Sequence, residues 1–166
     1  TVTGYSLTGA DAGNYLIVQP TGLTANVTPA PLTVSTSSVN RVYDGTTNAA
    51  GTNVITSGSL FSTDTLAGGT YSFVSKNVGS NVTVNVSGVS VNDGNGGNNY
   101  TLTQAPNNTS NITPASLSVT GVTAANKVYD GTVAATLGGT ASVTPIGLDS
   151  VTVTGTGSGS FATKHV

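Results

Sequence analysis

Two short segments of the chain carry the same charged and aromatic residues in the same frame. The shared residues are Tyr43, Asp44 and Gly45 in NRVYDGT, and Tyr129, Asp130 and Gly131, 86 positions later, in NKVYDGT. A short carboxylate before a glycine can accept backbone N–H groups of a turn, while the glycine adopts a positive φ. We therefore predict that these residues form a structural framework in each segment. Ligand binding is the alternative interpretation.

Every other charged residue also has a partner at nearly the same spacing, as expected for internal repeats. The pairs are Arg41 with Lys127, Asp64 with Asp149, Lys76 with Lys164, and Asp11 with the loop that contains Asp93 and Asn95. A catalytic site normally requires polar residues found in one place only, so we predict that the chain is not an enzyme. Lys76 and Lys164 are predicted framework residues that form ion pairs or hydrogen bonds; a covalent bond from lysine to asparagine is the alternative.

The segment NDGNGGNNY (92–100) combines oxygen-bearing side chains with glycines, as calcium-binding loops do. Calcium prefers six to eight oxygen ligands, usually including several carboxylates, and Asp93 is the only charged residue in this segment. We therefore favour a hairpin loop, with Asp93 and Asn95 as candidate ligands of a weak calcium site. No other cofactor is expected, because His165 is the only imidazole and the chain has no cysteine.

The composition predicts an all-β protein. The chain has 30 Thr and 22 Gly but no Glu, and 36% of its residues are hydrophobic. Threonine, valine and tyrosine favour strands, whereas glycine and asparagine favour turns. Alternating valines in 81–91 indicate a strand, and short runs around Leu32 and Tyr71 indicate others. Disordered low-complexity sequence is the alternative, but the chain is close to neutral and rich in alternating valine.

The repeats define three segments. Residues 31–115 form one complete unit, 1–30 resemble the C-terminal half of a unit, and 116–166 resemble the N-terminal half of another. About seven short strands in roughly 85 residues favour tandem small antiparallel β-sandwiches of immunoglobulin-like kind. A β-grasp-like repeat, which requires a helix, is the alternative. We expect the two halves to complete each other through a longer array or between copies, so the main predicted partner is the chain itself.

The charge and hydropathy exclude two classes of partner. The formal net charge is −2, and four scattered cations cannot form the basic patch that nucleic acid requires. No apolar run approaches the ~18 residues of a membrane-spanning helix, so we expect no membrane insertion. A surface rich in hydroxyls and amides favours an extracellular or cell-surface location. A host or matrix carbohydrate or protein is a further candidate partner.

VYDGT occurs twice, NVTPA and NITPA recur, and DAGNY precedes the first complete unit. With these motifs at this spacing, the chain resembles the YDG repeat of large bacterial surface and secreted adhesins of the filamentous-haemagglutinin-like kind. The resemblance covers essentially the whole chain, as one full copy and two halves. It implies an extracellular, tandemly repeated β-domain that serves as a stalk or an adhesive module, and it supplies no catalytic residues.

Overall fold

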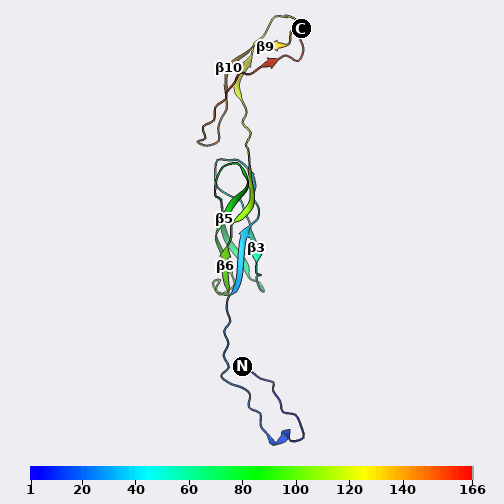
Figure 1. Ribbon diagram of the computed structural model, residues 1–166, viewed down its shortest axis with the longest axis vertical. Coiled ribbons are helices and arrows are strands. Elements are labelled where there is room, and N and C mark those ends of the chain that lie inside the picture. Colours follow the sequence, from blue (N-terminus) through cyan, green and yellow to red (C-terminus); the bar gives the residue numbers. More distant parts are fainter. Residues whose placement is uncertain (166) are drawn as a thin grey trace.

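The chain adopts an extended, almost entirely β structure. The computed structural model describes residues 1–165; Val166, the last residue of the predicted segment 116–166, lies outside the described residues. Figure 1 shows three parts along one long axis, with the N-terminal segment at one end, a central body of strands, and the C-terminal segment at the other end. The prediction of an all-β fold is confirmed.

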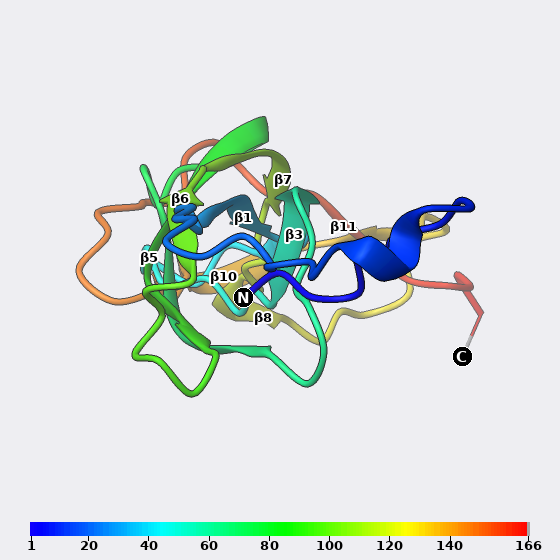
Figure 2. The ribbon, with the colours of Figure 1, turned by 90° about the horizontal axis from the view of Figure 1, so that it is seen from below.

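Seven strands form the central body. They are β1 (Ala30–Thr36), β2 (Asn40–Val42), β3 (Asn53–Ser57), β4 (Thr65–Phe73), β5 (Gly79–Asn92), β6 (Tyr100–Gln104) and β7 (Asn107–Thr113). One sheet has the order β3-β1-β6, and the other has the order β2-β7-β5-β4. Figure 2, which views the molecule from below its long axis, shows β1 between β3 and β6.

The sheets of the central body are mixed rather than antiparallel throughout, because two of the strand pairs are parallel. β1 pairs with β6 and β2 pairs with β7 in parallel, whereas the β1–β3, β4–β5 and β5–β7 pairs are antiparallel. β1 and β6 are neighbours in one sheet, and the strands that follow them, β2 and β7, are neighbours in the other. The two chain segments therefore cross from one sheet to the other side by side and in the same direction. Backbone bonds join them on the way, from Ala105 N to Val34 O at 2.8 Å and from Asn111 N to Val39 O at 3.0 Å.

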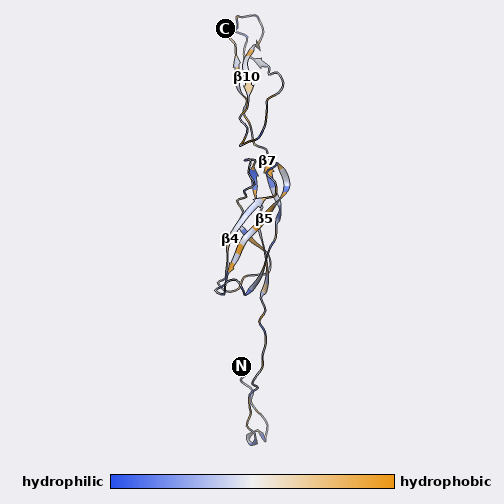
Figure 3. Ribbon diagram, turned by 90° about the vertical axis from the view of Figure 1, so that its left-hand side faces the viewer, coloured by the Kyte–Doolittle hydropathy of each residue, from blue (hydrophilic) through white to orange (hydrophobic). Residues whose placement is uncertain are grey.

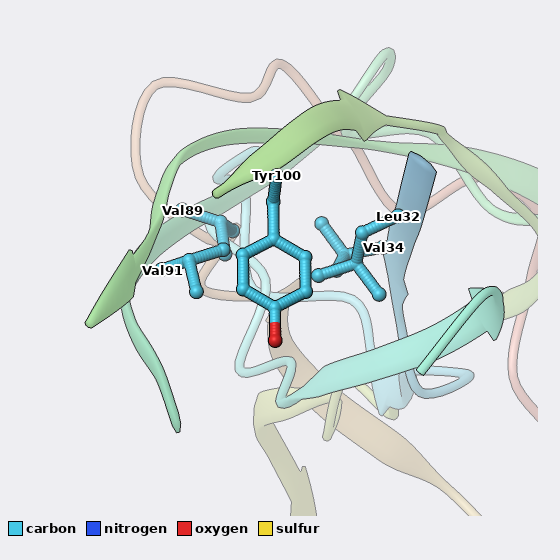
Figure 4. Close-up of a cluster of buried hydrophobic side chains, with 5 residues drawn as sticks. All are labelled: Leu32, Val34, Val89, Val91 and Tyr100. Atoms are coloured by element: carbon cyan, nitrogen blue, oxygen red, sulfur yellow. The ribbon is translucent and has the colours of Figure 1, made fainter. Parts of the chain in front are cut away.

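The core of the central body consists of two small apolar clusters. One contains Leu32 and Val34 of β1, Val89 and Val91 of β5, and Tyr100 of β6 (Figure 4). The other contains Val39, Phe73, Val84 and Ile112. Alternation along each strand directs every second side chain inward, which is why Leu32 and Val34 are buried on the same face.

The two end segments have little regular structure. The C-terminal segment has β8 (Thr120–Ala124) paired with β10 (Leu137–Ser142), and β9 (Ala134–Ala135) paired with β11 (Gly159–Ser160). The N-terminal segment has only a short 3₁₀ turn, η1 (Ala12–Asn14). Figure 3 shows hydrophobic residues on β10 as well as on the central strands. All fully buried hydrophobic side chains of the described residues nevertheless lie between Leu32 and Ile112.

The helix content distinguishes between the β-sandwich and the β-grasp-like repeat, the two folds that the sequence analysis left open. η1 is the only helical element within residues 1–165, so the helix that a β-grasp unit requires is missing from this part of the chain. No helix among the described residues is long and apolar enough to cross a membrane.

Candidate functional site at the junction between repeats

The central body and the C-terminal segment meet at the carboxylate of Asp149. The Tyr43 hydroxyl donates a hydrogen bond to Asp149 Oδ2 at 2.6 Å, and Lys76 Nζ donates to Asp149 Oδ1 at 2.6 Å. The Lys76 ammonium also lies 5.8 Å from the centroid of the Tyr43 ring, within cation–π range. The tyrosine and lysine therefore form a site that holds one carboxylate of the following segment.

Strand ends and turns position these three side chains. Tyr43 directly follows β2, Lys76 lies between β4 and β5, and Asp149 lies in a turn in which its N–H donates to Ile146 O at 3.2 Å. A Cβ added at Gly45 would lie 3.3 Å from the Ile146 Cγ2 methyl, and Gly45 has a φ of +78°. Both the close approach and the positive φ explain why a glycine follows Asp44 in the first YDG loop.

The junction is an ion pair at neutral pH. Hydrogen bonds from Lys76 and then from Tyr43 lower the pKa of the Asp149 carboxyl. The hydrogen bond to Asp149, followed by the interaction with Tyr43, raises the pKa of the Lys76 ammonium. The Asp149 side chain is half-buried, whereas that of Lys76 is more exposed, so salt and water screen the contact in part. It therefore serves to orient the two segments more than to stabilise them.

The first YDG loop is closed by its own aspartate. Asp44 Oδ1 accepts hydrogen bonds from Thr46 N and Thr46 Oγ1, both at 2.9 Å. Arg41 Nη1 lies 2.6 Å from Asp44 Oδ2, and its guanidinium carbon lies 4.8 Å from the centroid of the Phe73 ring. The backbone hydrogen bond from Thr46 is the main cause of the lowered pKa of Asp44. Asp44 thus holds the turn and the arginine together.

The second YDG loop has the same contacts. Asp130 Oδ1 accepts hydrogen bonds from Thr132 N and Thr132 Oγ1, both at 2.9 Å, and from Lys127 Nζ at 2.8 Å. Lys127 Nζ lies 5.7 Å from the centroid of the Phe161 ring, and Gly131 has a φ of +77°. The bond from Lys127, followed by that from Thr132 N, lowers the pKa of Asp130 to about 2. Each repeat therefore builds this loop from its own residues.

Tyr129 and Lys164 are the counterparts of Tyr43 and Lys76 in the C-terminal segment. Both line a hollow of about 290 Å³, together with Asn126, Phe161 and His165. The Tyr129 side chain is exposed, and no hydrogen bond or ion pair within residues 1–165 involves the side chain of Tyr129 or Lys164. The tyrosine–lysine pair thus occurs twice, and within residues 1–165 only the pair Tyr43 and Lys76 holds a carboxylate.

Backbone N–H groups of the loop 92–100 donate hydrogen bonds to the carboxylate of Asp93. Asp93 Oδ1 accepts N–H groups of Asn95 and Gly97, each at 2.8 Å, and Oδ2 accepts that of Asn99 at 3.0 Å. The bond from Gly97 contributes most to the lowered pKa of Asp93. Within the described residues, no three His, Cys, Asp or Glu side chains gather as metal ligands. Asp93 holds the hairpin loop, and its use as a calcium ligand with Asn95 stays a prediction.

The partners of Asp64 and Asp149 were not predicted by the sequence analysis. The Tyr100 hydroxyl donates to Asp64 Oδ2 at 2.6 Å and accepts the N–H of Phe61 at 2.8 Å. Burial, and then the bond to Asp64, raise the pKa of Tyr100. The second contact is the one between Asp149 and the preceding unit. The only available signal was the recurrence of Asp64 as Asp149, and it does not identify their partners.

The fold and the junction define a protein of tandem β-repeat units, two of which meet within the chain through Tyr43, Lys76 and Asp149. The family model of the YDG domain matches residues 28–109 and 113–166. The chain therefore belongs to the YDG domain family. The first match covers most of the central body, and the second covers the C-terminal segment. No curated protein and no solved structure matches the chain.

Proposed function

We propose that this chain is a non-enzymatic structural repeat of an extracellular bacterial surface protein or fibre, and that its units follow one another head to tail in a rod. The observation that carries the proposal is the complementarity of the two end segments. Each exposes apolar residues whose repeat equivalents are buried in the central body. An adhesive role at the cell surface, in the manner of filamentous-haemagglutinin-like exoproteins, belongs to the same proposal.

The N-terminal segment is the repeat equivalent of the strands that end a unit. Tyr15 is 73% exposed, whereas its equivalent Tyr100 is 7% exposed in the core. Val27 is 100% exposed, whereas its equivalent Ile112 is 1% exposed. Burial of apolar surface is favourable by about 25 cal/mol of free energy per Å². This segment therefore gains free energy when a partner covers the same face that β6 and β7 bury in the central body.

The C-terminal segment carries the strands that begin a unit. Val119 is 56% exposed, whereas its equivalent Val34 is fully buried. Phe161 donates its N–H to Val133 O at 2.8 Å, just as Phe73 donates to Thr47 O at 2.8 Å. This backbone pairing of the C-terminal segment thus matches that of the central body, while Val119 is exposed.

The two segments lie at opposite ends of the molecule (Figure 1). They are too far apart to complete each other within one chain, so each requires the continuation of an array or a second copy. A contact between unlike ends does not close on itself and propagates into a filament. Addition of strands to an unfinished sheet is a general mode of such assembly.

The test uses two copies joined through a linker of about six residues, which spans at most ~20 Å. We expect proteolysis to cleave the ends of a single chain but to spare the joint of the tandem chain. In the second copy, Val27→Asp should remove this protection. Leu16→Asp is the matched control, because Leu16 is also exposed but corresponds to the exposed Thr101. A joint that is cleaved as fast as the free ends refutes the proposal.

A binding module for carbohydrate or protein is the second candidate function. The Phe61 ring is exposed and stacks on Tyr100, with 6.3 Å between ring centroids and 20° between planes. Exposed aromatic side chains are enriched at binding surfaces. A glycan array with the full chain tests this function: Phe61→Ala should abolish any binding, and binding that survives the substitution places the ligand elsewhere.

A further inference from the structure

We infer that Tyr129 and Lys164 form a docking site for one carboxylate, and that its occupant is Asp64 of a second copy of this chain. The inference rests on the proposed head-to-tail order of units and assigns the residues that join them. The same type of site is occupied within the chain, where Tyr43 and Lys76 hold Asp149 through two contacts of 2.6 Å.

The site at Tyr129 and Lys164 and the site at Tyr43 and Lys76 are held by the same framework. Each tyrosine precedes an aspartate that accepts the N–H of the threonine two residues later, at 2.9 Å in both loops. Shortly before each lysine, a phenylalanine N–H bonds to a backbone carbonyl next to the YDG turn, at 2.8 Å in both cases. In this framework, Tyr129 and Lys164 line the same hollow.

Asp64 matches Asp149 as the occupant. Asp64 N–H donates to Phe61 O at 3.1 Å, and Asp149 N–H donates to Ile146 O at 3.2 Å, so both aspartates end the same kind of turn. Asp64 Oδ2 accepts the Tyr100 hydroxyl, while Oδ1 has no hydrogen bond within the described residues. A carboxylate offers about four acceptor positions, so Asp64 can accept a second tyrosine and a lysine as well.

In the assembled order, each aspartate would connect two units. It accepts the buried tyrosine of its own unit, as Asp64 accepts Tyr100, and the tyrosine–lysine pair of the preceding unit, as Asp149 accepts Tyr43 and Lys76. The Tyr15 hydroxyl of a second copy corresponds to that of Tyr100 and would therefore reach Asp149. Opposite charges meet at each such joint, which favours one direction of assembly.

The experiment uses carbodiimide, which couples a lysine and a carboxylate only when they touch. The protein is the tandem chain of two complete copies, and peptide mapping locates the products. The Lys76–Asp149 product within each copy is the internal positive control, since these groups are 2.6 Å apart. We expect an additional product between Lys164 of the first copy and Asp64 of the second, reduced several-fold in 1 M salt, where the Debye length is about 3 Å.

Matched variants separate the possible outcomes. Lys164→Arg keeps the charge but cannot be coupled, so it should remove the new product and leave the Lys76–Asp149 product unchanged. A protected joint without a Lys164–Asp64 product overturns this inference, while the proposed function stands. An unprotected joint overturns both. A product between Lys164 and another aspartate also overturns the assignment of Asp64.

Discussion

Replacement of Val34 with alanine should strongly destabilise the central body. Val34 is fully buried among Leu32, Val89, Val91 and Tyr100. The change removes two methyl groups, each worth about 0.8 kcal/mol of burial. The cavity left behind adds a penalty that depends on how far the neighbours relax. We expect a loss of roughly 2–3 kcal/mol, which at 4–8 °C per kcal/mol lowers the Tm by about 8–24 °C.

Val119→Ala is the matched control, because Val119 is the repeat equivalent of Val34 but is 56% exposed. In the single chain, this substitution should cost under about 1 kcal/mol, since the removed methyl groups are largely in water already. In the tandem chain, Val119 of the first copy should become buried, and its substitution should approach the effect of Val34→Ala. Urea unfolding followed by circular dichroism measures the free energy of unfolding of each variant.

Two results would refute this reasoning. Equal losses for Val34→Ala and Val119→Ala in the single chain would mean that the C-terminal segment already buries its apolar face. Equal and small effects of Val119→Ala in the single and tandem chains would mean that the second copy does not cover that face.

Three further predictions concern the turns and loops. Gly51→Ala should cost about 1–3 kcal/mol, because the added Cβ would overlap Thr36 Oγ1, whereas Gly13→Ala has open space and should be nearly neutral in thermal unfolding. The second YDG loop should loosen in acid: since folding lowers the pKa of Asp130 to about 2 from 3.8, its stabilising effect is complete above pH ~4 and is lost as the pH falls towards ~2. NMR of the loop amides should show this transition in the wild type but not in Asp130→Asn. Calcium or EDTA should leave the Tm unchanged; a rise of several degrees with calcium that Asp93→Asn removes would identify a metal site instead.

Local features of this protein could be predicted from its sequence. The β class follows from the abundance of threonine and valine and the absence of glutamate. The YDG loops were recognisable because Asp44 bonds to Thr46 and Arg41, which lie within three residues of it. Contacts over such short separations depend on backbone preferences that the neighbouring residues largely set themselves.

The pairing of distant segments was decided by the tertiary structure. The parallel β1–β6 and β2–β7 pairs follow from the way two chain segments cross together between the sheets. Likewise, Asp64 meets Tyr100 across 36 residues, and Asp149 meets Tyr43 across 106. The repeat showed that these aspartates are equivalent but not which hydroxyl or ammonium each contacts. Many topologies are compatible with one alternating pattern of apolar residues, and only packing of the complete chain selects among them.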